Sequence, residues 1–409
     1  MPSPSQSDTE HLAVLVLGMH RSGTSALARL VGYLDIALPS DGIDAHPDNS
    51  KGYWEPQAVV AVDDRILRTA RTSWFDPRPF PLDRIPPGVR SAHRADLRSA
   101  IWQSYGNASR IVIKDPRLCR LVPMITDALA EDGRAVRAVL MLRSPAAVAQ
   151  SLHRRDRSTT AYAHALWLRH MIDAERATRD LPRVVLTYDS LLDDWHAPMA
   201  RLARLAGRAA WTPDDATVQA IDAFLDHDLR HHSAGQDPAL EPQLASHVMA
   251  IERSLLALVD ADDDEARTRV DTLAQAWESK PDLLDDIIHD ELRHRRFEEL
   301  RLRSVYPELE ASLPPTPPSP AQPEAVPIAP AEVAPIPVSL KDQVTTISDS
   351  RLFDTDWYVT RYPDVTASGL DPIVHYLTIG AARGYDPNPL FRTGYYAWQL
   401  SRRDAADAI

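Results

Sequence analysis

Short runs of apolar residues alternate with longer amphipathic segments in the first half of the chain. The run at residues 12–17 (LAVLVL) carries no charge and predicts a buried strand, and residues 25–34 (SALARLVGYL) predict the helix that follows it. Further elements are predicted as strands at 110–114, 136–143 and 183–187 and as helices at 118–130 and 162–180. This alternation predicts crossover connections and a parallel sheet, with ligands beyond the carboxyl ends of the strands.

The second half of the chain has a different pattern. Residues 214–313 are polar and acidic with charges on most turns, which predicts a solvated helical extension. Residues 314–338 are rich in proline and lack glycine, which predicts a semi-rigid linker. Beyond it, LFDTDWYVTRYPDV near Leu352 and LFRTGYYAWQL near Leu390 begin alike, which predicts a repeat of about 38 residues whose second copy stops early.

These patterns divide the chain into five parts. With 409 residues and 44% apolar content, the protein can bury one large core and hold a second module. We expect a disordered N-terminal tail at 1–10, an α/β domain at 11–235, the helical extension at 236–313, the linker at 314–345 and a small helical module at 346–409.

Charge and cysteine content narrow the class of protein. The formal net charge of −13 argues against a nucleic-acid-binding protein, because a phosphate backbone requires clustered positive surface. The single cysteine, Cys119, has no internal disulfide partner, and the N-terminus lacks the layout of a signal peptide. No run approaches the roughly 20 apolar residues of a membrane span. We therefore expect a cytoplasmic protein without a transmembrane segment, and a position at the inner face of the membrane stays open.

The stretch GMHRSGTS, after the first strand, has the glycine spacing of a phosphate-binding loop. Gly18 and Gly23 keep that spacing, but Thr24 stands where a nucleotide triphosphatase carries lysine. The cation is instead Arg21, whose planar guanidinium can face an anion in a bidentate manner. The loop also supplies hydroxyl donors from Ser22, Thr24 and Ser25. Such a loop suits a 5′-phosphate without a metal, and an ordinary strand-to-helix turn is the alternative.

A second basic stretch follows the strand at 136–143. That strand ends in Arg143, Pro145 suits a helix start, and Ser151 lies about two helical turns further on. We expect Arg143 and Ser151 to hold one additional phosphate, with the basic run at 153–157 adding positive charge. The alternative is a surface helix with scattered arginines.

Together these stretches resemble the sulfotransferases that use 3′-phosphoadenosine 5′-phosphosulfate (PAPS). The resemblance covers roughly residues 12–233 and is carried by GMHRSGTS, DNSKGYWEP, VIKDPR and RSPAAVAQSL. It is strongest to the bacterial branch, which has arginine in the loop where cytosolic enzymes have PKSGTTW. The resemblance implies a P-loop-type three-layer α/β fold with a central parallel sheet. It also implies PAPS as co-substrate without a metal, bound at the 5′-phosphosulfate by Arg21, Ser22, Gly23, Thr24 and Ser25 and at the 3′-phosphate by Arg143 and Ser151.

Sulfuryl transfer to a hydroxyl needs a base for the acceptor proton and cations on the transferring group. We assign Arg21 to the bridging and leaving oxygens. Glu55 is our choice for the base, because it resembles the acidic residue that follows the loop in related carbohydrate and tyrosine sulfotransferases. Neighbouring Tyr53 and Trp54 would partly desolvate Glu55 and raise its pKa. The alternative for Glu55 is a charge at the N-terminus of a helix at 57–68, which Pro56 would start.

Other candidates lie near the ends of the predicted strands. Lys114 and Arg117 are expected to touch the sulfuryl group or the acceptor. Asp115 either orients one of them, serves as an alternative base, or forms a structural ion pair. The histidines that remain as candidates are His20, His46, His231 and His232. No histidines and acids fall at the spacing of a metal site.

The C-terminal stretch WYVTRYPDVTASGLDPIVHYLTIGAARGYDPNPLF resembles a repeat found beside bacterial glycosyltransferases and sulfotransferases that act on surface polysaccharides. This resemblance implies a carbohydrate or glycolipid acceptor and a docking role on glycan or on glycan-assembly enzymes. The aromatic residues of this stretch are interpreted as core rather than as sugar platforms: Trp357, Tyr358, Tyr362, Tyr376 and Tyr385. Two other functions stay open, namely a P-loop kinase using magnesium-ATP and a non-catalytic nucleotide-binding or docking protein.

Overall fold

The computed structural model of the protein describes residues 11–43, 52–80, 82–225, 240–305, 338–350, 353–362, 364–383 and 385–388. The chain divides into two compact units, Met1–Glu291 and Leu292–Ile409. Three predicted segments lie outside the described residues, namely the N-terminal tail, the proline-rich stretch as far as residue 337, and the second copy of the repeat.

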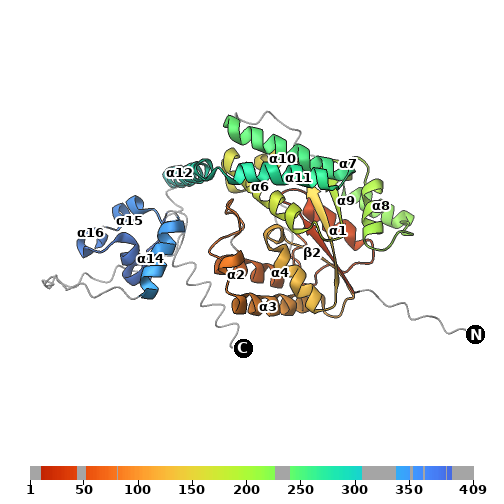
Figure 1. The fold of residues 1–409 in the computed structure, drawn as a ribbon, viewed down its shortest axis with the longest axis horizontal. Coiled ribbons are helices and arrows are strands. Elements are labelled where there is room, and N and C mark those ends of the chain that lie inside the picture. The colour runs from red at the N-terminus through yellow and green to blue at the C-terminus, as the bar shows by residue number, and fades with distance from the viewer. Residues whose placement is uncertain are drawn as a thin grey trace, which may run out of the picture. The chain divides into compact units, whose positions relative to one another are not determined.

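A parallel sheet of four strands forms the centre of the first unit (Figure 1). The strands are β1 (Leu12–Leu17), β2 (Arg110–Lys114), β3 (Ala135–Leu142) and β4 (Arg183–Thr187), in the order β2-β1-β3-β4. Val14 of β1 lies opposite Val112 of β2 and Arg137 of β3. The predicted parallel α/β sheet is confirmed, and all four carboxyl ends meet at one edge.

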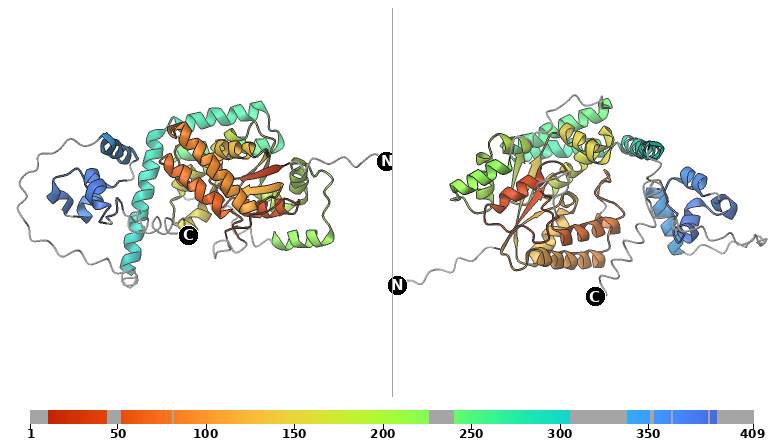
Figure 2. Two further views of the ribbon diagram at one scale, coloured as in Figure 1. Left: turned by 90° about the horizontal axis from the view of Figure 1, so that it is seen from below. Right: turned by 180° about the vertical axis from the view of Figure 1, so that it is seen from behind.

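Helices cover both faces of this sheet, as the two views of Figure 2 show. Leu12, Val14 and Val16 of β1 pack against α1 (Thr24–Gly32) and α8 (His196–Leu205). The opposite face is covered by α4 (Leu118–Glu131), which contacts β1, β3 and α6 (Thr160–Ala177). Because both faces are covered, β1 is a continuous apolar run without polar alternation. The fold therefore has the three layers that the sequence predicts.

The remaining helices of the α/β region frame the edge where the strands end. α2 (Gln57–Thr69) begins after Pro56, as predicted, and packs against α3 (Pro87–Tyr105). α5 (Pro145–Asp156) packs against α6, and the short α7 (Tyr188–Asp193) follows β4 directly. A single 3-10 turn, η1 (Leu82–Arg84), precedes α3. Each strand thus leads into a helix at the same edge of the sheet.

The helical extension is less solvated than the sequence predicts. It comprises α9 (Asp215–Phe224), α10 (Pro242–Asp260), α11 (Asp264–Glu278) and α12 (Pro281–Val305). α10 packs against α6, β4 and α11. Together α10 and α11 bury an apolar set made of Leu244, Val248, Ile251, Leu255, Leu258, Val270, Ala274 and Trp277. The prediction of a solvated extension is therefore wrong for these two helices.

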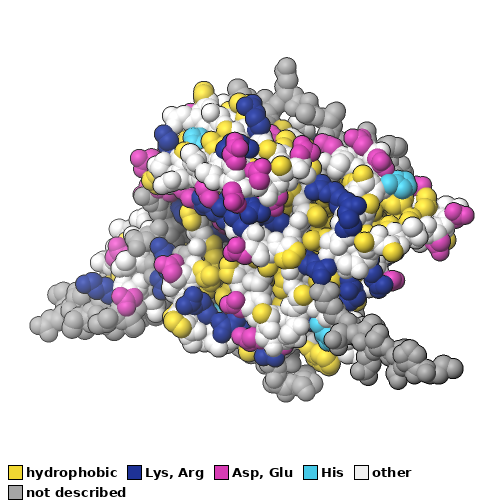
Figure 3. Space-filling view, turned by 45° about the vertical axis from the view of Figure 1, so that its right-hand side comes forward, with side chains coloured by type: hydrophobic (Ala, Val, Ile, Leu, Met, Phe, Trp, Pro, Cys, Tyr) yellow, Lys and Arg dark blue, Asp and Glu magenta, His cyan; other side chains and the backbone are white. Residues whose placement is uncertain are grey.

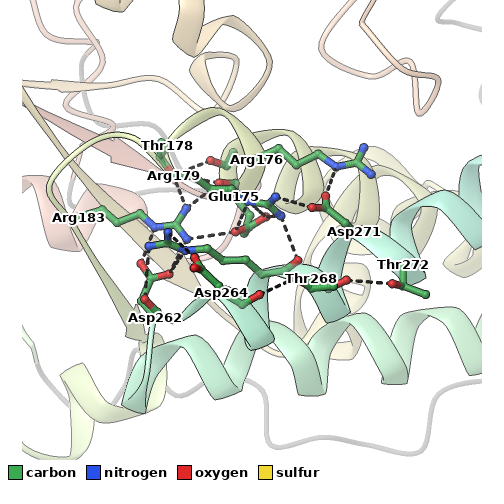
Figure 4. Close-up of polar contacts among 12 residues, drawn as sticks. Glu175, Arg176, Thr178, Arg179, Arg183, Asp262, Asp264, Thr268, Asp271 and Thr272 are labelled. Atoms are coloured by element: carbon green, nitrogen blue, oxygen red, sulfur yellow. Dashed lines mark hydrogen bonds and ion pairs between the residues drawn. The ribbon is translucent and has the colours of Figure 1, made fainter.

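Ion pairs explain why the charged extension packs against the α/β core rather than facing solvent. Glu175 of α6 is fully buried and accepts hydrogen bonds from Arg179 at 3.0 Å and Arg183 at 3.1 Å (Figure 4). Arg183 also donates to Asp262, between α10 and α11, at 2.6 and 2.8 Å, and Arg179 pairs with Asp271 of α11. The acidic residues of the extension thus neutralise arginines of the α/β core. On the face shown in Figure 3, Lys and Arg side chains likewise gather close to acidic ones.

The second unit contains a small helical module. Its elements are α14 (Val338–Ser350), α15 (Thr355–Arg361), α16 (Asp364–Ser368), α17 (Pro372–His375) and a π-helical turn, η3 (Tyr376–Gly380). α14 begins inside the range predicted as linker, because the last proline of the run is Pro337 and nothing after it interrupts a helix. The predicted linker end at residue 345 is therefore corrected to the start of α14.

Aromatic side chains form the core of this module. Tyr358 is fully buried, its hydroxyl lies 3.0 Å from Nδ1 of His375, and Tyr362 and Tyr376 pack around it. Gly380 approaches this ring so closely that a Cβ atom there would lie 2.0 Å from the Tyr358 hydroxyl oxygen. These contacts support the interpretation of the aromatic residues as core. Across the helices of the described ranges, none has the length and apolar character needed to cross a membrane.

Candidate active site

The loop between β1 and α1 has the backbone shape of an anion cradle. Arg21 has φ +69° and Gly23 has φ +85°, so the chain turns twice through the left-handed region within three residues. Such turns point backbone N–H groups toward one spot, and α1 begins directly after the loop, with its N-terminus at the same place. A Cβ atom at Gly23 would lie 2.2 Å from Cδ2 of Tyr188, so glycine is required there. The loop is thus built against Tyr188, which the sequence analysis did not single out.

The two arginines and the serine predicted to bind phosphates lie together. Arg21 donates from Nε to the Ser151 hydroxyl of α5 at 2.8 Å, and Arg143 donates to the Arg21 carbonyl at 2.7 Å. The Arg143 guanidinium lies over the Tyr188 ring, 4.6 Å from its centroid. The backbone carbonyl of Arg143 accepts a hydrogen bond from Nε1 of Trp167 at 3.2 Å. The strand-end position of Arg143 therefore brings its charge to the loop.

Lys114, the last residue of β2, connects the loop to the segment before α2. Its Nζ donates to Oε1 of Glu55 at 2.5 Å, to the Ser25 hydroxyl at 3.2 Å and to the Tyr53 carbonyl at 3.2 Å. Both charged groups are buried, with 2% exposure for Lys114 and 5% for Glu55. Burial raises the pKa of Glu55, although the nearby positive charge of Lys114 acts in the opposite direction.

Arg117 directly precedes α4 and forms ion pairs with acidic side chains. It donates to Asp64 of α2 at 2.7 Å and to Asp115 at 3.0 Å, and it lies 3.9 Å from Oε2 of Glu55. Asp115 is fully buried and also accepts the backbone N–H of Arg117 at 3.0 Å. Asp115 therefore holds Arg117 in an ion pair, which fits two of the roles that the sequence left open, namely orienting Arg117 and forming a structural ion pair. Burial and then the charge of Asp115 raise the pKa of adjacent Asp63 well above its usual value, which favours a neutral Asp63.

Buried polar atoms without partners mark the loop as a place where a ligand would bind. Within the described residues, Nε2 of His20 and the hydroxyl of Ser22 are buried without a hydrogen-bond partner. Burial, followed by the positive charges of Arg117 and Arg155, lowers the pKa of His20 well below its usual value, so the ring is neutral. Unsatisfied buried groups are rare in proteins, and a bound anion or acceptor would satisfy these two.

Four residues beyond the sequence prediction also shape the site. The Sγ atom of Cys119 accepts a hydrogen bond from the Gly18 N–H at 3.2 Å. Burial raises the pKa of the Cys119 thiol to about 12. Tyr188 and Asp64 contact Gly23 and Arg117 as described above, and Trp74 packs on His20 with ring centroids 4.3 Å apart. Tyr188 directly follows β4, at the same edge as Lys114 and Arg143. Its position after a strand could therefore have predicted that it lies at the site. Trp74 lies in a loop without any periodic pattern, and nothing in the sequence marked it.

Some predicted candidates stay untested by the geometry. Three of the candidate residues named in the sequence analysis lie outside the described ranges: His46, His231 and His232. No group of three or more His, Cys, Asp or Glu side chains within the described ranges is arranged to hold a metal ion. Independence from metal therefore stays a prediction.

Comparison with known proteins gives weak similarities. No family model and no curated protein matches the chain. Among solved structures, the chain is similar to the sulfotransferase domain of the Synechococcus PCC 7002 olefin synthase, with 16% identity, 59% of this chain and 94% of that chain covered, and a TM-score of 0.33. It is also similar to retinol dehydratase in complex with androsterone and the inactive cofactor PAP, with 14% identity, 62% and 82% covered, and a TM-score of 0.31. Because these TM-scores are low, we assign the fold from the strand order and the crossover connections of the chain itself.

Proposed function

We propose that the protein transfers a sulfuryl group from PAPS to a hydroxyl group of a saccharide or glycolipid acceptor. The observation that supports this most is the convergence of Arg21, Lys114 and Arg143 on one loop whose Ser22 hydroxyl is buried without a partner in the described part of the chain. A cradle with several cations and no loop lysine suits a sulfated nucleotide. The acidic group that the reaction needs, Glu55, contacts one of these cations.

The donor set fits the nucleotide in two places. Arg21, Ser22, Gly23, Thr24 and Ser25 would hold the 5′-phosphosulfate through side chains and backbone N–H groups. Arg143 and Ser151 would hold the 3′-phosphate, and both already contact Arg21, which would link the two phosphate positions. PAPS, when bound, would supply the sulfuryl group. This assignment is supported by left-handed φ angles and an unsatisfied hydroxyl within the loop, and by the charges of Lys114 and Arg143 that reach it.

Glu55 is the proposed base. As the acceptor oxygen bonds to sulfur and the bond from sulfur to the 5′-phosphate oxygen breaks, the acceptor proton passes to Glu55. The raised pKa of Glu55 makes it a better proton acceptor than an exposed carboxylate. Protonation would also weaken its ion pair with Lys114, leaving the Lys114 charge for the transferring group and Arg21 for the departing phosphate. Arg117, which Asp115 orients, lies on the Glu55 side of this arrangement.

A P-loop kinase is the second candidate, because Asp115 is a buried carboxylate directly after β2. Oδ1 of Asp115 accepts a hydrogen bond from Arg117, and the neutral Asp63 shares a hydrogen bond with the Asp115 carboxylate. A carboxylate oxygen at the end of a strand suits magnesium in a nucleotide site. Against this candidate, Thr24 occupies the lysine position of the loop, and Lys114, which contacts the loop at Ser25, is paired with Glu55.

Thermal unfolding with two nucleotides separates these functions. Adenosine 3′,5′-bisphosphate in EDTA is compared with magnesium-ATP, on the wild-type protein and on Arg143→Ala. A ligand at about 100 times its Kd stabilises the folded state by about 2.7 kcal/mol, which shifts the melting temperature measurably. We expect a metal-independent shift with the bisphosphate that Arg143→Ala loses. A shift with magnesium-ATP alone would exclude the sulfotransferase and support the kinase.

Catalysis is tested with Glu55→Gln and Lys114→Ala. We expect both variants to bind the bisphosphate while sulfuryl transfer from PAPS falls about 100-fold or more. Bisphosphate binding by a wild-type protein that shows no turnover would favour a non-catalytic nucleotide-binding protein.

We further propose that the C-terminal module docks on glycan or on glycan-assembly enzymes, and that the enzyme acts in the cytoplasm, with the inner membrane face as an alternative. Nucleic acid is not proposed as a partner.

A further inference from the structure

An aromatic loop borders the candidate active site. Residues 71–80, here called the Trp74 loop, follow α2. The Trp74 ring packs on His20, which belongs to the phosphate loop, and Phe75 packs edge-on against Trp74 with centroids 5.5 Å apart. His20 in turn lies close enough to Lys114 and Arg117 for their charges to lower its pKa. The Trp74 loop therefore contacts the loop between β1 and α1 through His20.

The loop is held by its backbone, which leaves its aromatic side chains exposed. Arg120 of α4 is 2% exposed and donates to the carbonyls of Ser73 at 2.7 Å, Asp76 at 2.9 Å and Arg78 at 2.6 Å. Tyr162 donates its hydroxyl to the carbonyl of Phe75. Despite this anchoring, Phe75 is 47% exposed and Trp74 is partly exposed. A buried arginine thus fixes a loop in which the Phe75 ring is half exposed and the Trp74 ring is partly exposed.

Polar groups surround these rings. The Arg155 guanidinium of α5 lies over the Trp74 ring, 5.9 Å from its centroid, and pairs with Asp156. Within the loop, Thr72 donates to Asp76 at 3.2 Å, and Arg78 lies 3.6 Å from the same carboxylate. A site for a fully apolar alcohol would be lined mainly by apolar side chains. Flat rings with charged groups at their rim instead suit a ligand that has an apolar face and hydroxyl groups along its edge.

We infer that Trp74 and Phe75 form the acceptor wall, on which one sugar ring packs with its C–H face while its hydroxyls meet the polar rim. None of the contacts proposed for the nucleotide uses either ring. The wall would place a neighbouring hydroxyl at the His20 side of the loop, toward Glu55 and Lys114. This inference rests on the proposed sulfuryl transfer, and it adds where the acceptor binds and which face it presents.

The test measures oligosaccharide binding to the full chain loaded with adenosine 3′,5′-bisphosphate. The probes are cellotetraose, chitotetraose and a hyaluronan tetrasaccharide, with 4-nitrophenol as an alcohol that is not a saccharide, and saturation-transfer NMR titrations report affinity. The variants are Trp74→Ala and Phe75→Ala. Trp102→Ala is the matched control, because it removes the same side chain from the surface of α3, where Trp102 is 66% exposed. Bisphosphate affinity is measured in every variant.

We expect the wild type and Trp102→Ala to bind at least one tetrasaccharide equally. Trp74→Ala should weaken that binding about tenfold and Phe75→Ala by a smaller factor, with bisphosphate affinity unchanged in Phe75→Ala. If Trp74→Ala does not fold, Phe75→Ala carries the comparison, because its side chain is half exposed.

Four results would overturn the inference. If the wild type binds the bisphosphate but none of the tetrasaccharides, or if both loop variants bind a tetrasaccharide like the wild type, the saccharide wall is refuted while the nucleotide site stands. If only 4-nitrophenol binds and Trp74→Ala weakens it, the wall serves an aromatic alcohol. If the wild type does not bind the bisphosphate, the proposed function fails and the inference falls with it.

Discussion

Replacing Glu175 by glutamine tests whether buried charge holds the extension on the α/β core. Glu175 is fully buried and accepts hydrogen bonds from both Arg179 and Arg183. The substitution keeps the shape but removes the charge, and it turns an amide NH₂ toward one of the guanidinium groups. Hydrogen bonds to charged groups contribute about 1.5–3 kcal/mol each, and removing one partner of a buried ion pair costs about 3–5 kcal/mol.

The lower end of this range applies to Glu175→Gln. Arg183 retains Asp262 and Arg179 retains Asp271, so neither arginine becomes an isolated charge. We therefore expect a loss of about 3 kcal/mol in the free energy of unfolding. The matched control is Glu265→Gln on α11, where Glu265 is 82% exposed at its side chain and pairs with Arg269 at 2.6 Å. That exposed pair should contribute at most about 0.5 kcal/mol.

Urea unfolding followed by tryptophan fluorescence measures both variants. Trp277 of α11 is 2% exposed, so its emission reports when the extension separates or unfolds. Free energies come from the midpoint and slope of each transition. A cost below about 1 kcal/mol for Glu175→Gln, or equal costs for the two variants, would refute the reasoning. The apolar contacts of α10 and α11 alone would then hold the extension.

Three further predictions follow from the same contacts. Although burial opposes the charged form, hydrogen bonds from Arg183 and Arg267 lower the pKa of Asp262 to about 2, below the 3.8 of an unperturbed group. Its contribution to stability is therefore present above pH about 4 and lost as the pH falls toward about 2, and acid unfolding of Asp262→Asn should lack that component. Gly23→Ala should weaken bisphosphate binding at least about tenfold in calorimetry, because its Cβ would meet Tyr188 at a positive φ; unchanged affinity would contradict the loop geometry. The transfer rate should rise with pH through the raised pKa of Glu55, and a pH profile of Glu55→Gln with the same rising limb would exclude Glu55 as the base.

The sheet was predictable because its strands are short apolar runs bounded by polar residues. β2 and β4 have the predicted bounds, and β3 begins one residue early at Ala135. The position after parallel strands identified Lys114 and Arg143, because such side chains meet at one edge, and the glycine spacing of the loop identified Arg21. Neither signal identified their mutual contacts, such as the Lys114–Glu55 pair, since Glu55 lies before a helix rather than after a strand.

Long-range pairing limited the remaining predictions. Arg183 and Asp262 are 79 positions apart, and Arg120 binds carbonyls 42 to 47 positions earlier in the chain. Periodicity within a helix shows that charges are present but not which distant groups neutralise them. The charged helices α10 and α11 were therefore assigned to solvent, and the Trp74 loop, which has neither period nor motif, was not assigned to any function.

The contact between Gly18 and Cys119 makes the only thiol of the chain a reporter of loop opening. The Sγ atom accepts the first backbone N–H of the phosphate loop at 3.2 Å, and the side chain is fully buried. A thiol in this position reacts with an alkylating reagent only when the loop or α4 moves away, so the labelling rate of the native protein counts such openings. A nucleotide that closes the loop should slow this labelling, which gives a label-based measure of occupancy without any engineered residue.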